Sequence, residues 1–172
     1  MSQLLVFIGK PGVGKTTIIE NLEPRIEHVD VLPFVQKYII DGVLQEDKTI
    51  VAYKEMYDSL EEKLLSQNTP LILELGTNHA PLNIEKLGEL MEKNHVSIFL
   101  CDASIDICRE RALERDRVMA SDSLERRLSR DFPNSHTILL KEKKNEFILL
   151  DMAQPLEENI NIIQKHIINL SP

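Results

Sequence analysis

The sequence is poor in cysteine and contains no long hydrophobic run. No stretch approaches the ~20 apolar residues of a membrane span, and residues 1–3 lead into an apolar segment without the features of a secretory signal. Cys101 and Cys108 have no cysteine or histidine nearby at metal-binding spacing. We therefore expect a cytoplasmic protein with two buried free thiols and no membrane association.

Positive charge is also scarce and unevenly placed. The net charge of −8 at pH 7 argues against a general nucleic-acid-binding protein. No arginine occurs from residue 26 to residue 108, whereas seven of the eight arginines fall in residues 109–130, beside five acidic residues. An arginine-rich segment in an acidic chain predicts a local anion-binding site.

Apolar runs and helical periodicities alternate along the 172 residues. The expected strands are 4–8, 26–31, 71–75, 96–101 and 147–150. The expected helices are 16–22, 33–40, 51–66, 84–91, one from residue 104 to a break near 118–121, one from there to 131, and 155–167. We interpret residues 43–49 as a loop. This alternation predicts a three-layer α/β fold with a five-stranded, mostly parallel sheet, and residues 1–172 form one expected domain.

A glycine-rich segment follows the first apolar run. It fits G-x-x-x-x-G-K-[ST], the phosphate-binding loop, and comprises Gly9, Lys10, Pro11, Gly12, Val13, Gly14, Lys15, Thr16 and Thr17. Its glycines let successive N–H groups curl around a phosphate at the start of a helix. We therefore predict that this loop binds a nucleotide, that Lys15 reaches the β- and γ-phosphates, and that Thr16 ligates Mg²⁺.

Two further patterns accompany this loop. Glu74 lies near the end of an apolar strand, which is typical of a carboxylate that supports Mg²⁺ or contacts the phosphoryl acceptor. Arg111 and Arg115 are four residues apart and share one helix face, so both can point into a cleft. The alternative is a solvated face with Glu110 and Glu114. For Arg109, Arg126 and Arg130 we expect surface or structural roles.

Over nearly its whole length the chain resembles the small P-loop kinases, a group that includes adenylate, shikimate and gluconate kinases, zeta toxins and polynucleotide kinases. The resemblance rests on residues 9–17, on Glu74-Leu75-Gly76-Thr77-Asn78, on Asp102-Ala103-Ser104 with the following arginine pair, and on residues 122–128. It implies a short helical lid over about residues 116–133 and an adenine-edge loop at residues 150–155. It further implies that Arg111 stacks on adenine, that Arg115 grips phosphate, and that Arg127, or secondly Arg117, contacts the transferring phosphoryl group.

The acceptor region is less clearly defined. Asp30 matches the position where hydroxyl-phosphorylating relatives keep a general base, although an aspartate before Pro33 can equally be a turn residue. Gln36, Asn78 and His79 are polar candidates for acceptor contacts. Because arginine is missing from residues 26–108, and lysine lacks the bidentate fork, a phosphorylated acceptor is disfavoured.

These observations predict an ATP- and Mg²⁺-dependent kinase that phosphorylates a hydroxyl of a small metabolite or nucleoside. Lys15, Asp30, Arg115 and Arg127 are the expected catalytic residues, and Thr16 and Glu74 the expected metal residues. The alternatives are a nucleotide or polynucleotide 5′-hydroxyl kinase and an ATPase that acts as a nucleotide-dependent switch. We expect a monomer or homodimer, and the acceptor stays open.

Overall fold

The structure is built around a sheet with strand order β2-β5-β1-β6-β7. The computed structural model describes residues 1–115 and 121–167. The strands of this sheet are β1 (Gln3–Gly9), β2 (Glu27–Asp30), β5 (Leu71–Leu75), β6 (His95–Asp102) and β7 (Ile148–Asp151). Every neighbouring pair in it is parallel. The five-stranded, mostly parallel sheet expected from the sequence is therefore confirmed.

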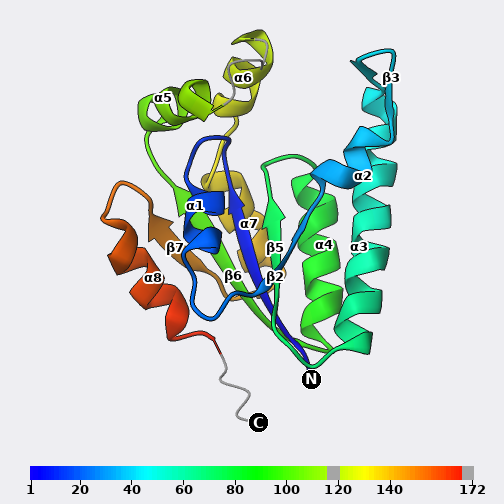
Figure 1. Ribbon diagram of the computed structural model, residues 1–172, viewed down its shortest axis with the longest axis vertical. Coiled ribbons are helices and arrows are strands. Elements are labelled where there is room, and N and C mark those ends of the chain that lie inside the picture. The colour runs from blue at the N-terminus through cyan, green and yellow to red at the C-terminus, as the bar shows by residue number, and fades with distance from the viewer. Residues whose placement is uncertain (116–120, 168–172) are drawn as a thin grey trace.

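Helices cover both faces of the sheet (Figure 1). One face packs against α3 (Thr49–Ser66), α4 (Ala80–Met91) and α7 (Asn134–Glu142). The other packs against α1 (Lys15–Glu20), α5 (Ile105–Arg115), α6 (Ser121–Leu128) and α8 (Leu156–Gln164). Each face has its own hydrophobic cluster. The predicted three-layer α/β architecture is thus confirmed.

The first apolar run forms the central strand β1, and its burial explains why apolar and polar residues do not alternate along it. All seven residues of β1 are buried, because helices cover the sheet on both sides. Leu4 and Val6 contribute to one cluster, and Leu5 and Phe7 to the other. Phe7 stacks on Phe99 of β6, with ring centroids 5.1 Å apart. Period-2 geometry therefore sends successive apolar side chains into two different cores.

Three regions differ from the sequence predictions. The helix expected over residues 33–40 is shorter, α2 (Leu32–Gln36), and residues 43–49 are not a simple loop. Instead, β3 (Ile39–Ile40) and β4 (Val43–Leu44) form an antiparallel hairpin, followed by the 3₁₀ helix η1 (Glu46–Lys48). The hairpin turn contains Asp41 and Gly42, both with positive φ, so this Asp-Gly pair makes a hairpin rather than ending a helix. Helix α7 was not predicted.

The lid expected over residues 116–133 is described only from residue 121. Residues 116–120, and with them Arg117, lie outside the described residues. Helix α6 is joined to α5 by Arg109, whose Nε and Nη2 donate to the carboxylate of Glu125 at 2.6 and 2.9 Å. No helix in the described part of the chain is long and apolar enough to cross a membrane.

Candidate active site

The phosphate-binding loop connects the end of β1 to the start of α1, as its motif predicts. Gly12 and Gly14 have φ values of +74° and +107°, which L side chains rarely adopt. A Cβ atom on Gly12 would lie 2.1 Å from the carbonyl oxygen of Cys108 in α5. The loop therefore needs glycine for its backbone angles and for its close approach to α5.

Lys15 is buried beneath this loop and points toward its backbone. Its Nζ donates to the carbonyl oxygens of Gly9 at 2.9 Å and Lys10 at 3.2 Å. Burial lowers the pKa of Lys15, the nearby Glu74 carboxylate opposes this effect, and the positive charge of Arg115 adds to it. Arg115 thus lies within electrostatic reach of Lys15, as expected if both side chains act on one anion.

Thr16 and Glu74 lie together where β1 and β5 end. The Thr16 hydroxyl donates to Glu74 Oε1 at 3.2 Å, and His28 Nε2 donates to Glu74 Oε2 at 3.1 Å. Burial alone would raise the pKa of Glu74, but the His28 hydrogen bond and the Lys15 charge bring it below its usual range. A hydroxyl beside an ionised carboxylate is a hard-oxygen donor set, so these residues fit Mg²⁺. His28, which the sequence did not single out, orients this carboxylate.

Asp30 lies beside Glu74 at the carboxyl edge of the sheet, where the two residues are register partners of β2 and β5. Its Oδ1 accepts a hydrogen bond from the backbone N–H of Leu32 at 3.1 Å. The turn role considered for this aspartate is therefore present. A role as general base remains a prediction, and its position at this edge is compatible with it.

A cavity of about 250 Å³ adjoins the phosphate loop on the α8 side. Gly14 and Thr17 line it, together with Arg111 and the loop after β7. Arg111 Nη1 donates to the carbonyl oxygens of Val13 at 3.1 Å and Met152 at 3.3 Å, which fixes the guanidinium at the cavity wall. The arrangement suits the adenine contact that the resemblance implies for Arg111 and for residues 150–155.

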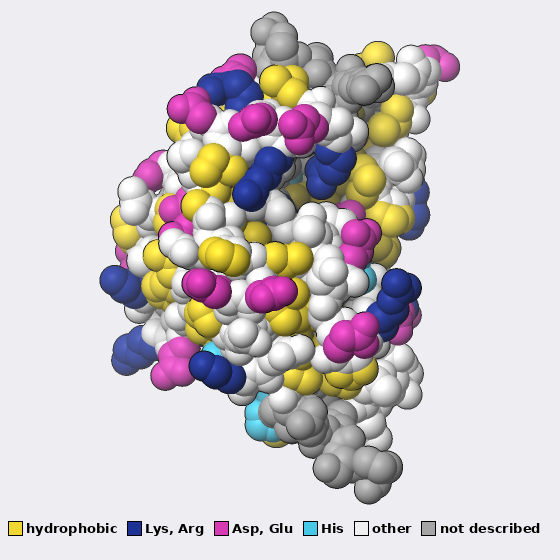
Figure 2. All heavy atoms as spheres, turned by 60° about the vertical axis from the view of Figure 1, so that its left-hand side comes forward, with side chains coloured by type: hydrophobic (Ala, Val, Ile, Leu, Met, Phe, Trp, Pro, Cys, Tyr) yellow, Lys and Arg dark blue, Asp and Glu magenta, His cyan; other side chains and the backbone are white. Residues whose placement is uncertain are grey.

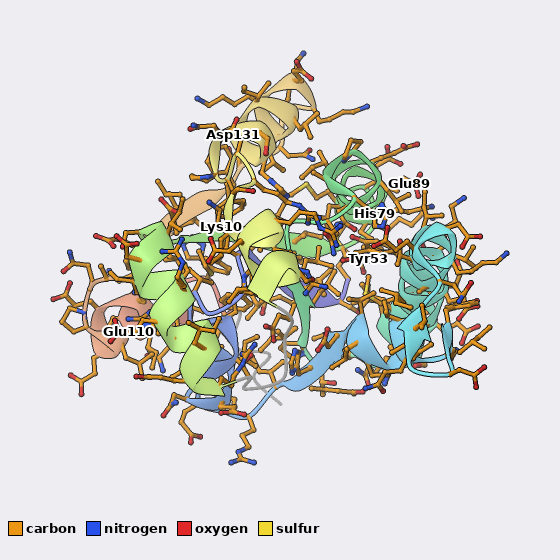
Figure 3. All side chains as sticks on the ribbon, turned by 90° about the horizontal axis from the view of Figure 1, so that it is seen from above. Lys10, Tyr53, His79, Glu89, Glu110 and Asp131 are labelled. Atoms are coloured by element: carbon orange, nitrogen blue, oxygen red, sulfur yellow. The ribbon has the colours of Figure 1, made fainter. Side chains whose placement is uncertain are left out.

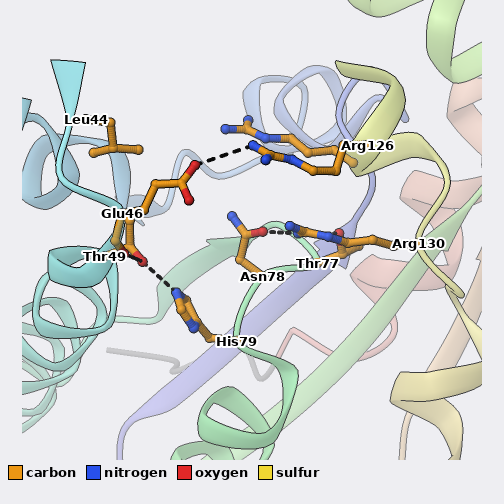
Figure 4. Close-up of a pocket in the computed structure, with 9 residues that line it drawn as sticks. Leu44, Glu46, Thr49, Thr77, Asn78, His79, Arg126 and Arg130 are labelled. Atoms are coloured by element: carbon orange, nitrogen blue, oxygen red, sulfur yellow. Dashed lines mark hydrogen bonds and ion pairs between the residues drawn. The ribbon is translucent and has the colours of Figure 1, made fainter. Parts of the chain in front are cut away.

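A second and larger cavity, of about 520 Å³, lies beyond the end of β5 (Figure 4). It is lined by Leu44, Glu46, Thr49, Thr77, Asn78, His79, Arg126, Arg127 and Arg130. The Thr49 hydroxyl donates to the carbonyl oxygen of Glu46 at 2.8 Å and lies 2.9 Å from His79 Nε2. Because the Thr49 hydroxyl donates to Glu46, its oxygen can accept a hydrogen bond from His79 in the tautomer that is protonated on Nε2.

The two cavities occupy different sides of the same edge of the sheet. Seen from above (Figure 3), Lys10 of the phosphate loop lies on one side of α6, and Tyr53 and His79 lie on the other. Both cavities lie at the carboxyl edge of the parallel sheet, where ligands of open α/β folds bind. Ligands of the loop and of the larger cavity would therefore lie on the two sides of α6.

The larger cavity bears on two expectations about arginine. Arg126 and Arg130, expected in surface or structural roles, both line it. The segment without arginine is bordered in space by arginines from α6 and the turn after it, and the expectation that a phosphorylated acceptor is disfavoured stays a prediction. Asn78 and His79 line this cavity, whereas Gln36 is exposed and is not among its described lining residues, and the acceptor contacts expected of all three stay predictions. Arg127 also lines this cavity.

Comparison with solved structures identifies the fold as that of the small P-loop kinases. A sugar kinase from a Janibacter species matches with a TM-score of 0.62 and 16% identity over 96% of this chain and 94% of that chain. Shikimate kinase from Acinetobacter baumannii, solved with shikimate, gives 0.61 and 19% over 96% and 93%. A gluconokinase from Sinorhizobium meliloti gives 0.59 and 16% over 95% and 90%. The sequence matches no protein-family model and no curated protein. At these identities the likeness establishes the fold alone.

Proposed function

We propose that this protein is an ATP- and Mg²⁺-dependent kinase that transfers the γ-phosphoryl group of ATP to a hydroxyl of a small molecule. The observation that carries the proposal is the juxtaposition of Lys15 and Thr16 of the phosphate loop with the Glu74 carboxylate near the end of β5. The structural relatives are named as kinases of a sugar, shikimate and gluconate, which supports a small hydroxylated acceptor. Residues 1–172 would work as one domain.

Each residue has a distinct part in this proposal. The backbone of the phosphate loop and Lys15 would bind the β- and γ-phosphates, while Thr16 and Glu74 would hold Mg²⁺, which neutralises phosphate charge when bound. Arg115 and Arg127 would stabilise the charge on the transferring group. The acceptor oxygen would form the new bond to the γ-phosphorus as the bond to the β–γ bridging oxygen breaks. Asp30 would accept the hydroxyl proton, and ADP would leave.

Release of ADP from Mg·ATP, measured alone and with a panel of sugars, polyols, hydroxy acids, nucleosides and nucleotides, tests this function. We expect one class to stimulate turnover, and we expect Lys15→Ala to abolish the stimulation because it removes the buried ammonium. Lys54→Ala, which changes an exposed lysine of α3, is the matched control and should leave turnover unchanged. Turnover that no acceptor stimulates would instead indicate the ATPase switch.

A further inference from the structure

Two polar side chains lie inside the apolar core between α3 and α4. Asn83 of α4 and Tyr57 of α3 are each 1% exposed, and Tyr57 belongs to the same hydrophobic cluster as Leu60, Ile84 and Leu87. Charged side chains, by contrast, are spread over the surface on the face that carries α5 and α8 (Figure 2). Burial of an amide and a phenol costs free energy unless both are hydrogen-bonded, whereas an apolar pair would carry no such cost. The buried polar pair therefore calls for an explanation.

The two side chains form a relay of hydrogen bonds that ends on the segment after β5. The Tyr57 hydroxyl donates to Asn83 Oδ1 at 3.0 Å, and Asn83 Nδ2 donates to the backbone carbonyl oxygen of Asn78 at 2.8 Å. Because a backbone carbonyl can only accept, the amide nitrogen must face Asn78 and the amide oxygen must face Tyr57. Burial raises the pKa of Tyr57, which keeps its hydroxyl protonated as the donor.

The backbone of Asn83 holds the next carbonyl group of the same segment. The Asn83 N–H donates to the carbonyl oxygen of His79 at 3.0 Å, so Asn83 bonds to the carbonyl groups of both Asn78 and His79. His79 has a φ of +50° and a ψ of +41°, a left-handed conformation that residues with a Cβ atom rarely adopt. The relay thus maintains an unfavourable backbone conformation at the start of α4.

This backbone conformation directs two side chains into the larger cavity. Asn78 and His79 both line it, and in Figure 4 one points toward Arg130 and the other toward Thr49. The His79 ring also packs edge-to-face against Tyr53, with ring centroids 4.9 Å apart. A change of φ at His79 would turn its Cβ atom and break these contacts. The geometry of the cavity wall therefore depends on the buried relay.

We propose that Asn83 is a positioning residue for the phosphoryl acceptor, because it holds Asn78 and His79 in the orientation that binds this substrate. Neither Asn83 nor Tyr57 is among the described residues that line the cavity, so both act through the segment after β5. Tyr57 fixes the amide of Asn83, and Asn83 fixes the segment. The assignment of the ligand as the acceptor rests on the proposed kinase function, whereas the positioning of the segment does not.

His79 reports the position of the segment without any ligand. Burial lowers the pKa of His79 below its usual 6.5. If Asn83→Leu releases the segment, the imidazole gains contact with water, and its pKa, followed by NMR of the ring protons, should rise toward the usual value. Tyr57→Phe should cause a smaller rise, because the Asn83 amide keeps its own bond to Asn78.

A second variant and a control separate positioning from general loss of packing. Asn83→Leu leaves the buried Tyr57 hydroxyl without its acceptor, so the double variant Tyr57→Phe/Asn83→Leu replaces both partners by apolar groups and should fold more stably. We expect the same rise in the pKa of His79 in both. Leu87→Val shortens a fully buried side chain one turn further along α4. It should lower stability without changing the pKa of His79.

Kinetics then test whether the positioned segment serves the acceptor. The assay uses the compound of the acceptor panel that stimulates ADP release. In both Asn83 variants the KM for this compound should rise at least about tenfold, as expected for lost hydrogen bonds, while the KM for Mg·ATP and kcat change much less. Leu87→Val should leave all three parameters unchanged.

The outcomes distinguish this proposal from the proposed function. An unchanged pKa of His79 in both Asn83 variants, or equal changes in Leu87→Val, would overturn the positioning role. If the pKa of His79 rises but no compound accepts a phosphoryl group, the kinase proposal fails and the positioning of the segment stands. If a compound is phosphorylated and its KM stays unchanged in both Asn83 variants, the kinase proposal stands and the role of Asn83 toward the acceptor is refuted.

Discussion

Replacement of Gly12 by alanine should disable the phosphate loop through a steric effect that the structure makes quantitative. The new Cβ atom would lie 2.1 Å from the Cys108 carbonyl oxygen and 2.7 Å from the Ala112 backbone nitrogen. Ordinary contact begins near 3.4 Å, so α5 would have to retreat by about 1 Å. Both nearest atoms belong to helix backbone, and Arg111 holds α5 to the loop through the Val13 carbonyl. A rotamer change cannot relieve the overlap.

Gly42 provides a matched control for this substitution. Its φ of +77° is close to the +74° of Gly12, but a Cβ atom there would meet nothing within 4 Å. Gly42→Ala should therefore cost only the backbone strain, about 1 kcal/mol. Gly12→Ala should add an overpacking cost of about 1–3 kcal/mol, for a total of about 2–4 kcal/mol.

Urea unfolding followed by circular dichroism measures both costs, and calorimetry with Mg·ADP measures nucleotide binding. We expect Gly12→Ala to lose at least about tenfold in ADP affinity because the loop must shift away from the phosphates. Gly42→Ala should bind ADP like the wild type. Equal losses of stability in the two variants, or wild-type ADP affinity in Gly12→Ala, would refute the steric reasoning.

Three other perturbations have defined outcomes. Arg115→Ala should lower kcat about 100-fold while changing ADP affinity much less, because the contact of Arg115 with the transferring phosphoryl group matters most in the transition state. Similar losses in kcat and in ADP affinity would argue against this catalytic role. His28→Ala should raise the Mg²⁺ concentration needed for half-maximal turnover up to about tenfold. His28→Gln should partly reverse this rise, because its amide can donate to Glu74. Burial lowers the pKa of His136 to about 4, below the usual 6.5. As the pH falls, His136 is therefore protonated in the unfolded chain before it is protonated in the folded one. About 3 kcal/mol of stability should be lost between pH 6.5 and about 4, and His136→Leu should make stability depend less on pH in this range.

Local chemistry explains which parts of the molecule could be predicted from sequence. The phosphate loop is contiguous, and its function is encoded in the glycines and in Lys15 and Thr16. The central strands β1 and β5 are largely apolar on both faces and therefore form continuous runs. Helix α7 escaped prediction because its fully buried side chains are only His136 and Leu140, while Ile138 is 56% exposed. This pattern does not resemble an apolar stripe.

The larger cavity could not be assembled from sequence because its parts are distant along the chain. Arg126 and Arg130 meet Glu46 and Asn78 only through the packing of α6 near the ends of β5 and η1. Sequence spacing indicated an anion site in residues 109–130 but not which ligand the arginines face. The hairpin was a different case, because the Asp41-Gly42 signal is present in the sequence and also suits the end of a helix.

The most direct test of the account is to follow the γ-phosphoryl group itself. Wild-type protein and Lys15→Ala are incubated with Mg·ATP labelled in the γ-phosphoryl group and a small-molecule cell extract, and labelled products are identified by mass spectrometry. The account predicts a labelled phosphate ester of a small hydroxylated compound, formed by the wild type and absent with Lys15→Ala. Label recovered only as inorganic phosphate would contradict it.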